Sequence, residues 1–202
     1  MSKASDFVIS SLHEKISNSE SVSLCEIGVN GGELIKKAIP ILRKYDRYYY
    51  FDYSSEIDKI KNMLKGCGFV SIGMGHTRKT YDSYAWSFQK IYCDLISIGA
   101  DPKIFDIVFL NGTNIFIHDM ATCAIIKLML KPNGIVVVNN TSWTFKSSKY
   151  WNPEINKKTK DMLTDEQINT SMEQILCKIL FENDESYSEI GLDCRYRAFL
   201  RN

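Results

Sequence analysis

The sequence predicts an α/β fold in which seven strands form a doubly wound, mostly parallel sheet with an antiparallel last strand and helices on both faces. Short apolar runs alternate with stretches of helical periodicity along the chain, and this alternation is typical of βαβ units. The run at 135–138 is apolar throughout, as expected of a strand covered on both faces. The length suits one domain, and we expect residues 1–202 to form it.

The first part of the chain predicts a leading helix and three strands, with a helix after each of the first two strands. Apolar residues lie on one helical face within residues 1–20. Pro40 must kink or limit the next helix, and Gly66 and Gly68 close the one after it. We expect helices over 5–17, 33–44 and 56–65, and strands over 22–27, 48–52 and 70–74.

The second part predicts two more strand–helix alternations and a closing antiparallel pair. Apolar and aromatic residues, beginning with Tyr81, recur at helical steps. Pro132 favours a turn at 131–134, and Thr164 with Gln167 forms a capping box ahead of an apolar helical run that reaches Ile179. We expect helices over 81–96, 115–130 and this final run, and strands over 105–110, 135–138, 187–192 and 195–200.

Composition narrows the class of protein. The 25 basic and 24 acidic residues leave a formal net charge of +1, which argues against a dedicated nucleic-acid binder. No apolar run approaches the roughly 20 residues that span a bilayer, and the start lacks a signal-peptide core. The six cysteines include no CxxC pair, so we expect free thiols, neither a disulfide framework nor a zinc site, and a cytoplasmic protein. The sequence leaves open whether the chain forms a homodimer.

Three predicted strands end in residues suited to ligand binding. Open α/β sheets bind ligands outside the carboxyl ends of their strands. The first strand ends in the glycine-rich turn 26–32, whose glycines allow a tight turn and close approach of a ligand. Asp52 ends the second strand, about 20 positions further on, where a carboxylate can bind ribose hydroxyls. The segment 111–114, Asn-Gly-Thr-Asn, follows the fourth strand.

Each of these features also has a purely structural interpretation. The glycine-rich turn can join a strand to a helix without binding anything. Asp52 can cap the following helix, although Ser54 and Ser55 are nearer candidates. The segment 111–114 can be an ordinary Asn-Gly turn.

Taken in order and spacing, these stretches resemble the class I S-adenosylmethionine-dependent methyltransferases, which are Rossmann-like. Residues 25–32 are similar to the family's first motif, acidic-x-Gly-x-x-x-Gly. Residues 105–112 and 130–140 resemble the fourth and fifth strands of the O-methyltransferase-like "methyltransferase domain 24" group, which read Phe-Asp-hydrophobic-Ile-Asp-Gly-Asp-His and Leu-Lys-Pro-Gly-Gly. The resemblance covers roughly residues 20–143.

The resemblance implies S-adenosyl-L-methionine as cofactor and assigns its contacts. Asp52 would bind the ribose hydroxyls, with Tyr53 beside the adenine. Asn111 would lie near the reactive methyl group. The methionine part of the cofactor would lie along the first motif, beside Glu26, Gly28, Asn30, Gly31 and Gly32. The residues after the third strand that would line the adenine pocket are Gly73 and Met74.

The departures from the family pattern concern a metal. Metal-dependent members of the wider family carry aspartates after the fourth and fifth strands, where this chain has Asn111, Asn139 and Asn140. Magnesium and calcium sites rely on carboxylates for their affinity. We therefore expect no catalytic metal.

Few residues can serve as a base if the acceptor must lose a proton. His118 lies four residues beyond Asn114, so both can face the same cleft. We interpret His118, Asn111 and Asn114 as the catalytic candidates, with His76 as a second histidine at the same end of the sheet. Either histidine can equally be an ordinary surface residue.

Residues 141–162 are the candidate lid and acceptor-binding loop. Aromatic residues alternate there with lysines, a composition that suits a flat anionic substrate or a single-stranded nucleic acid. The aromatic side chains can also simply fold onto the core.

The sequence thus predicts metal-independent methyl transfer to oxygen or nitrogen of a small molecule. A non-catalytic methyltransferase-like module is the main alternative, because asparagines end the strands. A methyltransferase acting on nucleic acid is less favoured. A nicotinamide-dependent oxidoreductase ranks last, since it expects GxGxxG where residues 28–32 read Gly-Val-Asn-Gly-Gly.

Overall fold

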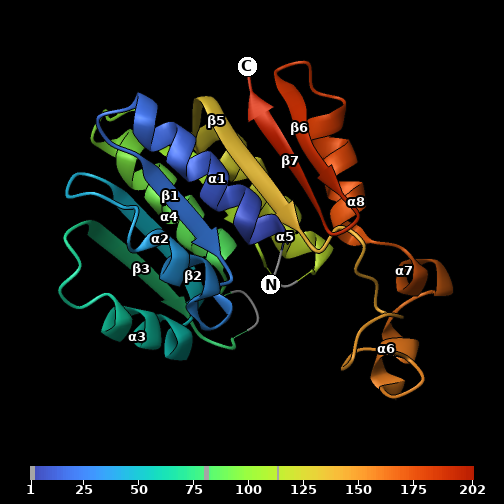
Figure 1. Cartoon of the computed structure of the whole chain (residues 1–202). Helices are drawn as coiled ribbons and strands as arrows, with labels where there is room; N and C mark the ends of the chain where they lie inside the picture. Colours follow the sequence, from blue (N-terminus) through green and yellow to red (C-terminus); the bar gives the residue numbers. More distant parts are fainter. Residues whose placement is uncertain (1–2, 80–81, 113) are drawn as a thin grey trace.

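A computed structural model describes residues 3–79, 82–112 and 114–202 and contains one seven-stranded sheet (Figure 1). The strands follow the order β3-β2-β1-β4-β5-β7-β6. Their bounds are β1 Ser23–Ile27, β2 Arg47–Tyr53, β3 Val70–His76, β4 Phe105–Leu110, β5 Leu130–Asn139, β6 Tyr187–Asp193 and β7 Tyr196–Arg201. The order reverses between β1 and β4, which is the switch point where such sheets bind ligands.

The predicted fold class is confirmed. Strands β1 to β5 pair in parallel, while β7 runs antiparallel to both β5 and β6. The chain's last strand is therefore antiparallel and lies between β5 and the edge strand β6. The helices before and between these strands are α1 Lys3–Asn18, α2 Glu33–Ala38, α3 Ser54–Met63, α4 Tyr84–Ser97, α5 Phe116–Met129, α6 Lys157–Met162, α7 Asp165–Asn169 and α8 Met172–Cys177.

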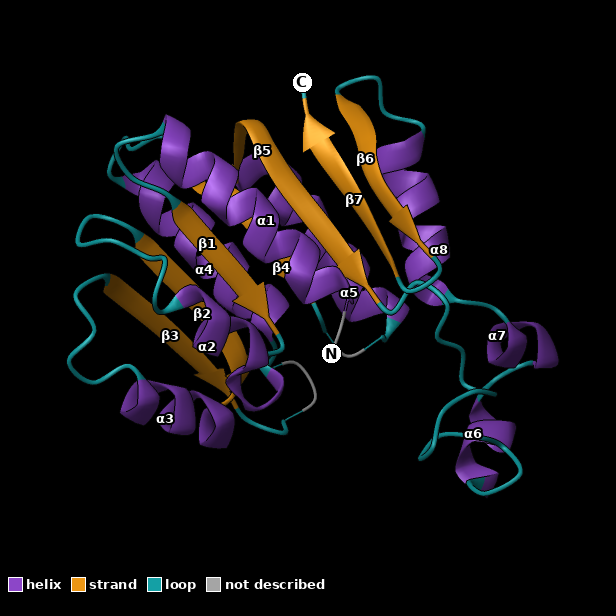
Figure 2. Ribbon diagram, in the orientation of Figure 1, coloured by secondary structure: helices purple, strands orange, loops and turns teal. Residues whose placement is uncertain are grey.

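Two apolar cores lie on the two faces of the sheet. Figure 2 shows α1 and α2 in front of the sheet and α4 and α5 behind it. Alternate residues of β2 illustrate the division, since Tyr48 and Tyr50 pack on the α1 side and Tyr49 and Phe51 on the α4 side. With both faces covered, only the strand ends remain open to a ligand.

Three segments differ from the elements that we expected. Helix α2 ends at Ala38, two residues before Pro40, because proline has no backbone N–H to donate and its ring clashes with the carbonyl group four residues earlier. The expected turn at 131–134 lies within the bounds of β5, where the register with β4 shifts and Asn133 has a φ of 58°. The long C-terminal helix is divided into α7, α8 and a π-helical turn, Lys178–Glu182.

The capping box of Thr164 and Gln167 is present at the start of α7. Tyr81, expected at the start of the helix that begins at Tyr84, and Thr113, expected in the loop after β4, lie outside the described residues, as do positions 1–2 of the expected N-terminal helix.

Residues 142–170 form a projection that we call the α6–α7 lobe. Both of its helices stand apart from the sheet (Figure 1). Its two arms are joined where the Lys146 amide donates to the Ile168 carbonyl at 3.1 Å. The expected irregular loop at 141–162 therefore contains a short helix. None of the described helices has the length and apolar character needed to cross a bilayer.

One carboxyl group, that of Glu26, lies within the α1-side core. Its side chain is fully buried and accepts a hydrogen bond from the Tyr48 hydroxyl. Burial raises the pKa of Glu26 to about 8, the Tyr48 hydrogen bond opposes the rise, and the nearby Asp52 carboxylate adds to it. Glu26 is therefore mostly protonated at neutral pH.

Protonation of Glu26 predicts a pH-dependent contribution to stability. The folded protein keeps a proton up to about pH 8 that the unfolded chain releases near its ordinary pKa of 4.5. The free energy of unfolding should therefore fall as pH rises across that range. Glu26→Gln should remove about 1 kcal/mol or more of this fall. Urea unfolding at several pH values between these limits measures it.

The comparison needs two further variants. Burial also raises the pKa of Glu173 to about 8, so Glu173→Gln should remove a second part of the same slope. The exposed Glu20 offers a matched control, because Glu20→Gln should keep the full slope. A slope unchanged by Glu26→Gln would show that Glu26 is ionised in the folded protein.

Candidate functional site

The glycine-rich turn after β1 is held between the ends of the two neighbouring strands. The Gly28 amide donates to the Phe51 carbonyl of β2 at 2.8 Å, and the Asn111 amide after β4 donates to the Ile27 carbonyl at 2.8 Å. Gly28 has a φ of +81°, in the left-handed region that favours glycine. The chain therefore turns at the switch point of the sheet.

The three glycines of this turn serve different purposes. A Cβ on Gly28 would lie 2.0 Å from the Asn111 carbonyl oxygen, so only glycine fits between β1 and the loop after β4. A Cβ on Gly32 would meet side chains of Ile60 and Met63, so this glycine brings the turn close to α3. A Cβ on Gly31 meets no described atom within 4 Å.

Asp52 fastens the same turn from β2. Its half-buried carboxylate accepts from the Val29 amide at 2.8 Å and from the Tyr53 amide at 2.7 Å. Tyr53 occupies the N-cap position of α3, which has no side-chain cap. Because a carboxylate offers about four lone-pair sites, Asp52 keeps capacity for a ligand hydroxyl.

Asn111 uses both ends of its amide on the protein itself. The amide nitrogen donates to the Gly28 carbonyl at 3.2 Å, and the amide oxygen accepts from Asn139 at 2.9 Å. The ends of β1, β4 and β5 are thereby joined by a neutral hydrogen-bond chain. In this state Asn111 positions the glycine-rich turn.

Two neighbouring cavities open at this end of the sheet. Tyr53, His76 and Tyr84 contribute to both, so the two form one cleft. The first cavity measures about 190 Å³ and is lined by Gly28, Asn30, Asp52, Tyr53, His76, Tyr84, Asn111 and Gly112. The second measures about 390 Å³ and is lined by Tyr53, His76, Thr77, Arg78, Lys79, Asp82, Ser83, Tyr84, Ile115 and His118. Small-molecule sites usually measure about 300–1,000 Å³.

His76, the last residue of β3, stands between the two cavities. Its ring is only 6% exposed and lies 4.6 Å from the Tyr53 ring. Burial lowers the pKa of His76, while the carboxylates of Asp52 and Asp82 oppose that change. Among the described residues, its Nδ1 atom has no hydrogen-bond partner. A neutral imidazole with one buried, unpaired ring nitrogen therefore forms part of the cleft wall.

Asp119 joins two of the elements that border the cleft. Its buried carboxylate accepts from the Tyr84 hydroxyl and, at 3.1 Å, from the Ile115 amide. This fixes α4 against the start of α5, with Gly112 packed over the carboxylate. We did not expect Tyr84 or Asp119 in the site; the only signal in the sequence was an aspartate in the first turn of a helix after a strand.

The structure brings together some of the residues predicted from the sequence. Gly28, Asn30, Asp52, Tyr53 and Asn111 line the smaller cavity, and His118 lines the larger one. The other predicted residues line neither cavity: Glu26, Gly31, Gly32, Gly73, Met74 and Asn114. Glu26 lies in the core, and the missing Cβ of Gly73 leaves room for the Tyr50 ring.

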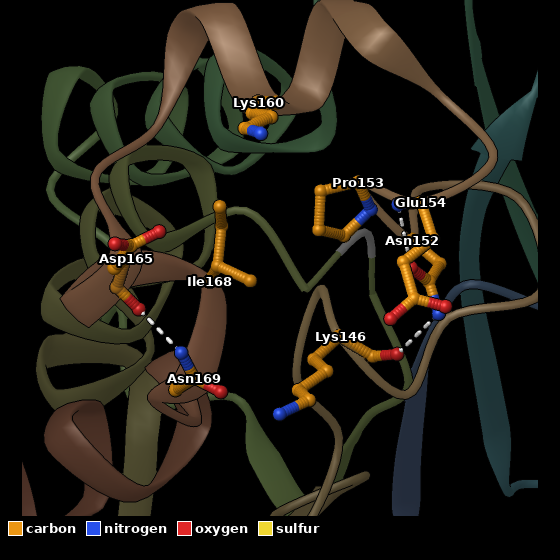
Figure 3. Close-up of a pocket in the computed structure, with 8 residues that line it drawn as sticks. All are labelled: Lys146, Asn152, Pro153, Glu154, Lys160, Asp165, Ile168 and Asn169. Carbon is orange, nitrogen blue, oxygen red and sulfur yellow. Dashed lines mark hydrogen bonds between the residues drawn. The ribbon is translucent and has the colours of Figure 1, made fainter.

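A further cavity, of about 240 Å³, lies inside the α6–α7 lobe (Figure 3) and shares none of its described lining residues with the cleft. Two of the asparagine side chains that line it bond to the backbone of the lobe itself. Asn152 donates to the Lys146 carbonyl at 2.8 Å, and Asn169 donates to the Asp165 carbonyl at 2.7 Å. These bonds hold the turns of the lobe in place.

Searches of family models and of curated proteins found no match to this chain. Solved structures do match. TomG, an O-methyltransferase from Streptomyces achromogenes involved in tomaymycin synthesis and solved with S-adenosylmethionine, aligns with a TM-score of 0.58 at 14% identity over 100% of this chain and 90% of its own. An O-methyltransferase from Bacillus cereus, solved with S-adenosylhomocysteine, aligns with a TM-score of 0.57 at 10% identity over 98% and 79%.

The chain has the class I methyltransferase fold. MycE, a methyltransferase of mycinamycin biosynthesis solved with Mg and S-adenosylhomocysteine, also aligns, with a TM-score of 0.54 at 16% identity over 97% of this chain. The chain spans about half the length of several matched structures: 48% of MycE and 50% of the CurJ carbon methyltransferase. At these identities the likeness concerns the fold alone.

The packing of the glycine-rich turn predicts different costs at two of its glycines. Gly28→Ala should lower the free energy of unfolding by about 3 kcal/mol or more, because left-handed strain of about 1–2 kcal/mol is joined by a collision with the Asn111 carbonyl. Gly31→Ala, with a similar φ and open space, should lose only about 1 kcal/mol. Chemical denaturation measures both, and equal losses would contradict the packing argument.

Proposed function

We propose that this chain binds S-adenosylmethionine at the carboxyl ends of β1 and β2 and transfers its methyl group to oxygen or nitrogen of a small molecule. One observation carries the proposal: the Asp52 carboxylate and the Gly28 turn meet in one cavity at the switch point of a methyltransferase fold. We propose the O-methyltransferase-like "methyltransferase domain 24" group as its family.

The residues of the cleft fit an adenosyl ligand. Asp52 is an acceptor for the ribose hydroxyls, as in other folds that bind an adenosine at this position. Tyr53 is 39% exposed, so its ring can stack on a base, and the His76 ring lies beside it in the cavity wall. Asn30 also lines this cavity, and the amino-acid portion would extend toward it.

The chain's own residues would contribute mainly by alignment. Bound S-adenosylmethionine supplies a methyl group that is already activated for in-line displacement. The cleft would hold the acceptor at the methyl group and exclude water. His118, half-buried in the larger cavity, would take the acceptor's proton where the acceptor has one to lose.

We propose that the reaction needs no metal. Asn111 is hydrogen-bonded to Asn139 and to the Gly28 carbonyl of the glycine-rich turn, and neither asparagine adds negative charge. The same observation favours the second candidate, a module that binds the cofactor without turnover. Product formation distinguishes the two candidates.

Cofactor binding predicts a loss of affinity when the Asp52 charge is removed. Asp52→Asn should weaken S-adenosylhomocysteine binding about 10- to 100-fold, since a hydrogen bond to a charged group contributes about 1.5–3 kcal/mol. The asparagine oxygen can still accept from the Val29 amide, which keeps the turn folded. Calorimetry measures the affinity, and the exposed Asp58→Asn provides the control.

A comparison of ligands tests the proposal independently of any variant. S-adenosylhomocysteine should raise the melting temperature of the wild-type protein, whereas NAD should not. Stabilisation by NAD alone would instead favour an oxidoreductase. No binding of S-adenosylhomocysteine at all would contradict the proposed function.

The role of His118 predicts a defect in turnover without a defect in binding. His118→Ala should lower methyl transfer about 100-fold or more and leave the affinity for S-adenosylhomocysteine unchanged. Transfer of labelled methyl groups into a cell extract, followed by mass spectrometry, measures it. His13→Ala on α1 should behave as wild type, and full turnover by His118→Ala would remove His118 from the mechanism.

A further inference from the structure

An apolar cavity of about 220 Å³ lies between the α6–α7 lobe and the start of α5. It is lined by Ile115, Trp143, Phe145, Trp151, Thr159, Met162 and Leu163. The Trp143 and Phe145 rings meet edge to face with centroids 5.0 Å apart. An engineered apolar cavity of about 150 Å³ holds benzene, so this one has room for a ring with a substituent.

One residue of this apolar lining, Thr159, carries a hydroxyl group. The Thr159 side chain on α6 is only 3% exposed, and its hydroxyl has no hydrogen-bond partner among the described residues. A buried hydroxyl without a partner costs about 1–3 kcal/mol. The cavity thus combines aromatic walls with one unused hydrogen-bonding group, the usual composition of a small-molecule site.

The apolar cavity adjoins the cleft of the proposed cofactor site. Ile115 lines both this cavity and the larger part of the cleft, where His118 also lies. A ligand held in the lobe could therefore reach toward His118. The described residues that line the apolar cavity include no lysine, although lysines surround them in the sequence.

We infer that this cavity is the acceptor subsite and that it takes an uncharged, flat aromatic ring that bears, besides the oxygen or nitrogen to be methylated, one hydrogen-bonding substituent that meets Thr159. This inference rests on the proposed function, because it names the class of acceptor for that same site. It replaces the anionic acceptor that the lysine-rich sequence suggests. The ring stacks among Trp143, Phe145 and Trp151, and its reactive end points toward the cleft.

A second copy of the chain is the other candidate occupant of this region. Met162 is 76% exposed and Trp151 is 51% exposed, and exposed apolar groups of this size can mark an interface. An interface would cover these outer atoms without needing a hollow that contains a buried hydroxyl. The unpartnered Thr159 therefore favours a small ligand.

The test uses the whole chain and two probes of the same shape, 4-methylphenol and toluene. Ligand-observed NMR should show that wild type binds 4-methylphenol more tightly than toluene. Thr159→Val keeps the side-chain shape and removes the hydroxyl. It should weaken 4-methylphenol binding about three- to tenfold and leave toluene binding unchanged. Ile155→Ala, an exposed apolar residue of the lobe outside the cavity, should change neither affinity.

Three results would overturn the inference. The first is failure of both probes to bind, and the second is equal binding of 4-methylphenol by wild type and Thr159→Val. The third is a dimer in sedimentation that Met162→Glu dissociates while neither form binds 4-methylphenol, because a second copy would then cover the cavity. S-adenosylhomocysteine binding is measured in the same samples. If it persists while the probes fail, only the acceptor class is wrong; if it fails, the proposed function is wrong.

Discussion

The close approach of the Gly28 turn to the loop after β4 is the constraint on which the rest of the site depends. The Gly28 amide fastens this turn to β2, the Asn111 amide fastens the loop after β4 to the end of β1, and a side chain at Gly28 would collide with Asn111. Asp52 then fixes Val29 from the side. Strand ends that would otherwise diverge are thereby held around one cavity, so that a ligand meets a preformed site and little ordering is needed on binding.

Much of the fold could be predicted because alternation of apolar runs and helical periods is a local signal. The exceptions are places where tertiary packing decides. The residues at 131–134 read as a turn, yet they belong to β5 because the strand pairs with β4 on both sides of a register shift. The final helical run looked continuous, but Ser171 caps a new helix and interrupts it. Local propensity does not record which partner each segment meets.

The candidate site could be predicted only in part, for a related reason. Asp52 and Gly28 end strands, and topology alone brings strand ends together. Facing was harder. Glu26 lies two residues beyond Leu24 on the same strand, so its side chain shares the face of Leu24 and enters the α1-side core, away from the cleft. The contact between Asp119 and Tyr84 joins two helices through residues that are 35 positions apart in the sequence, and no spacing rule in one sequence predicts such a pair.

The hydrogen bonds of the cleft divide its polar groups into two kinds. Asn111 and Asn139 are committed to holding the strand ends, whereas His76 keeps an unused ring nitrogen and Asp52 keeps spare lone pairs. The committed groups are neutral, so they impose little charge on a cationic sulfonium or on its acceptor. A donor that carries its own activation needs alignment more than acid–base assistance. The division therefore suits methyl transfer better than reactions in which the protein must generate the electrophile.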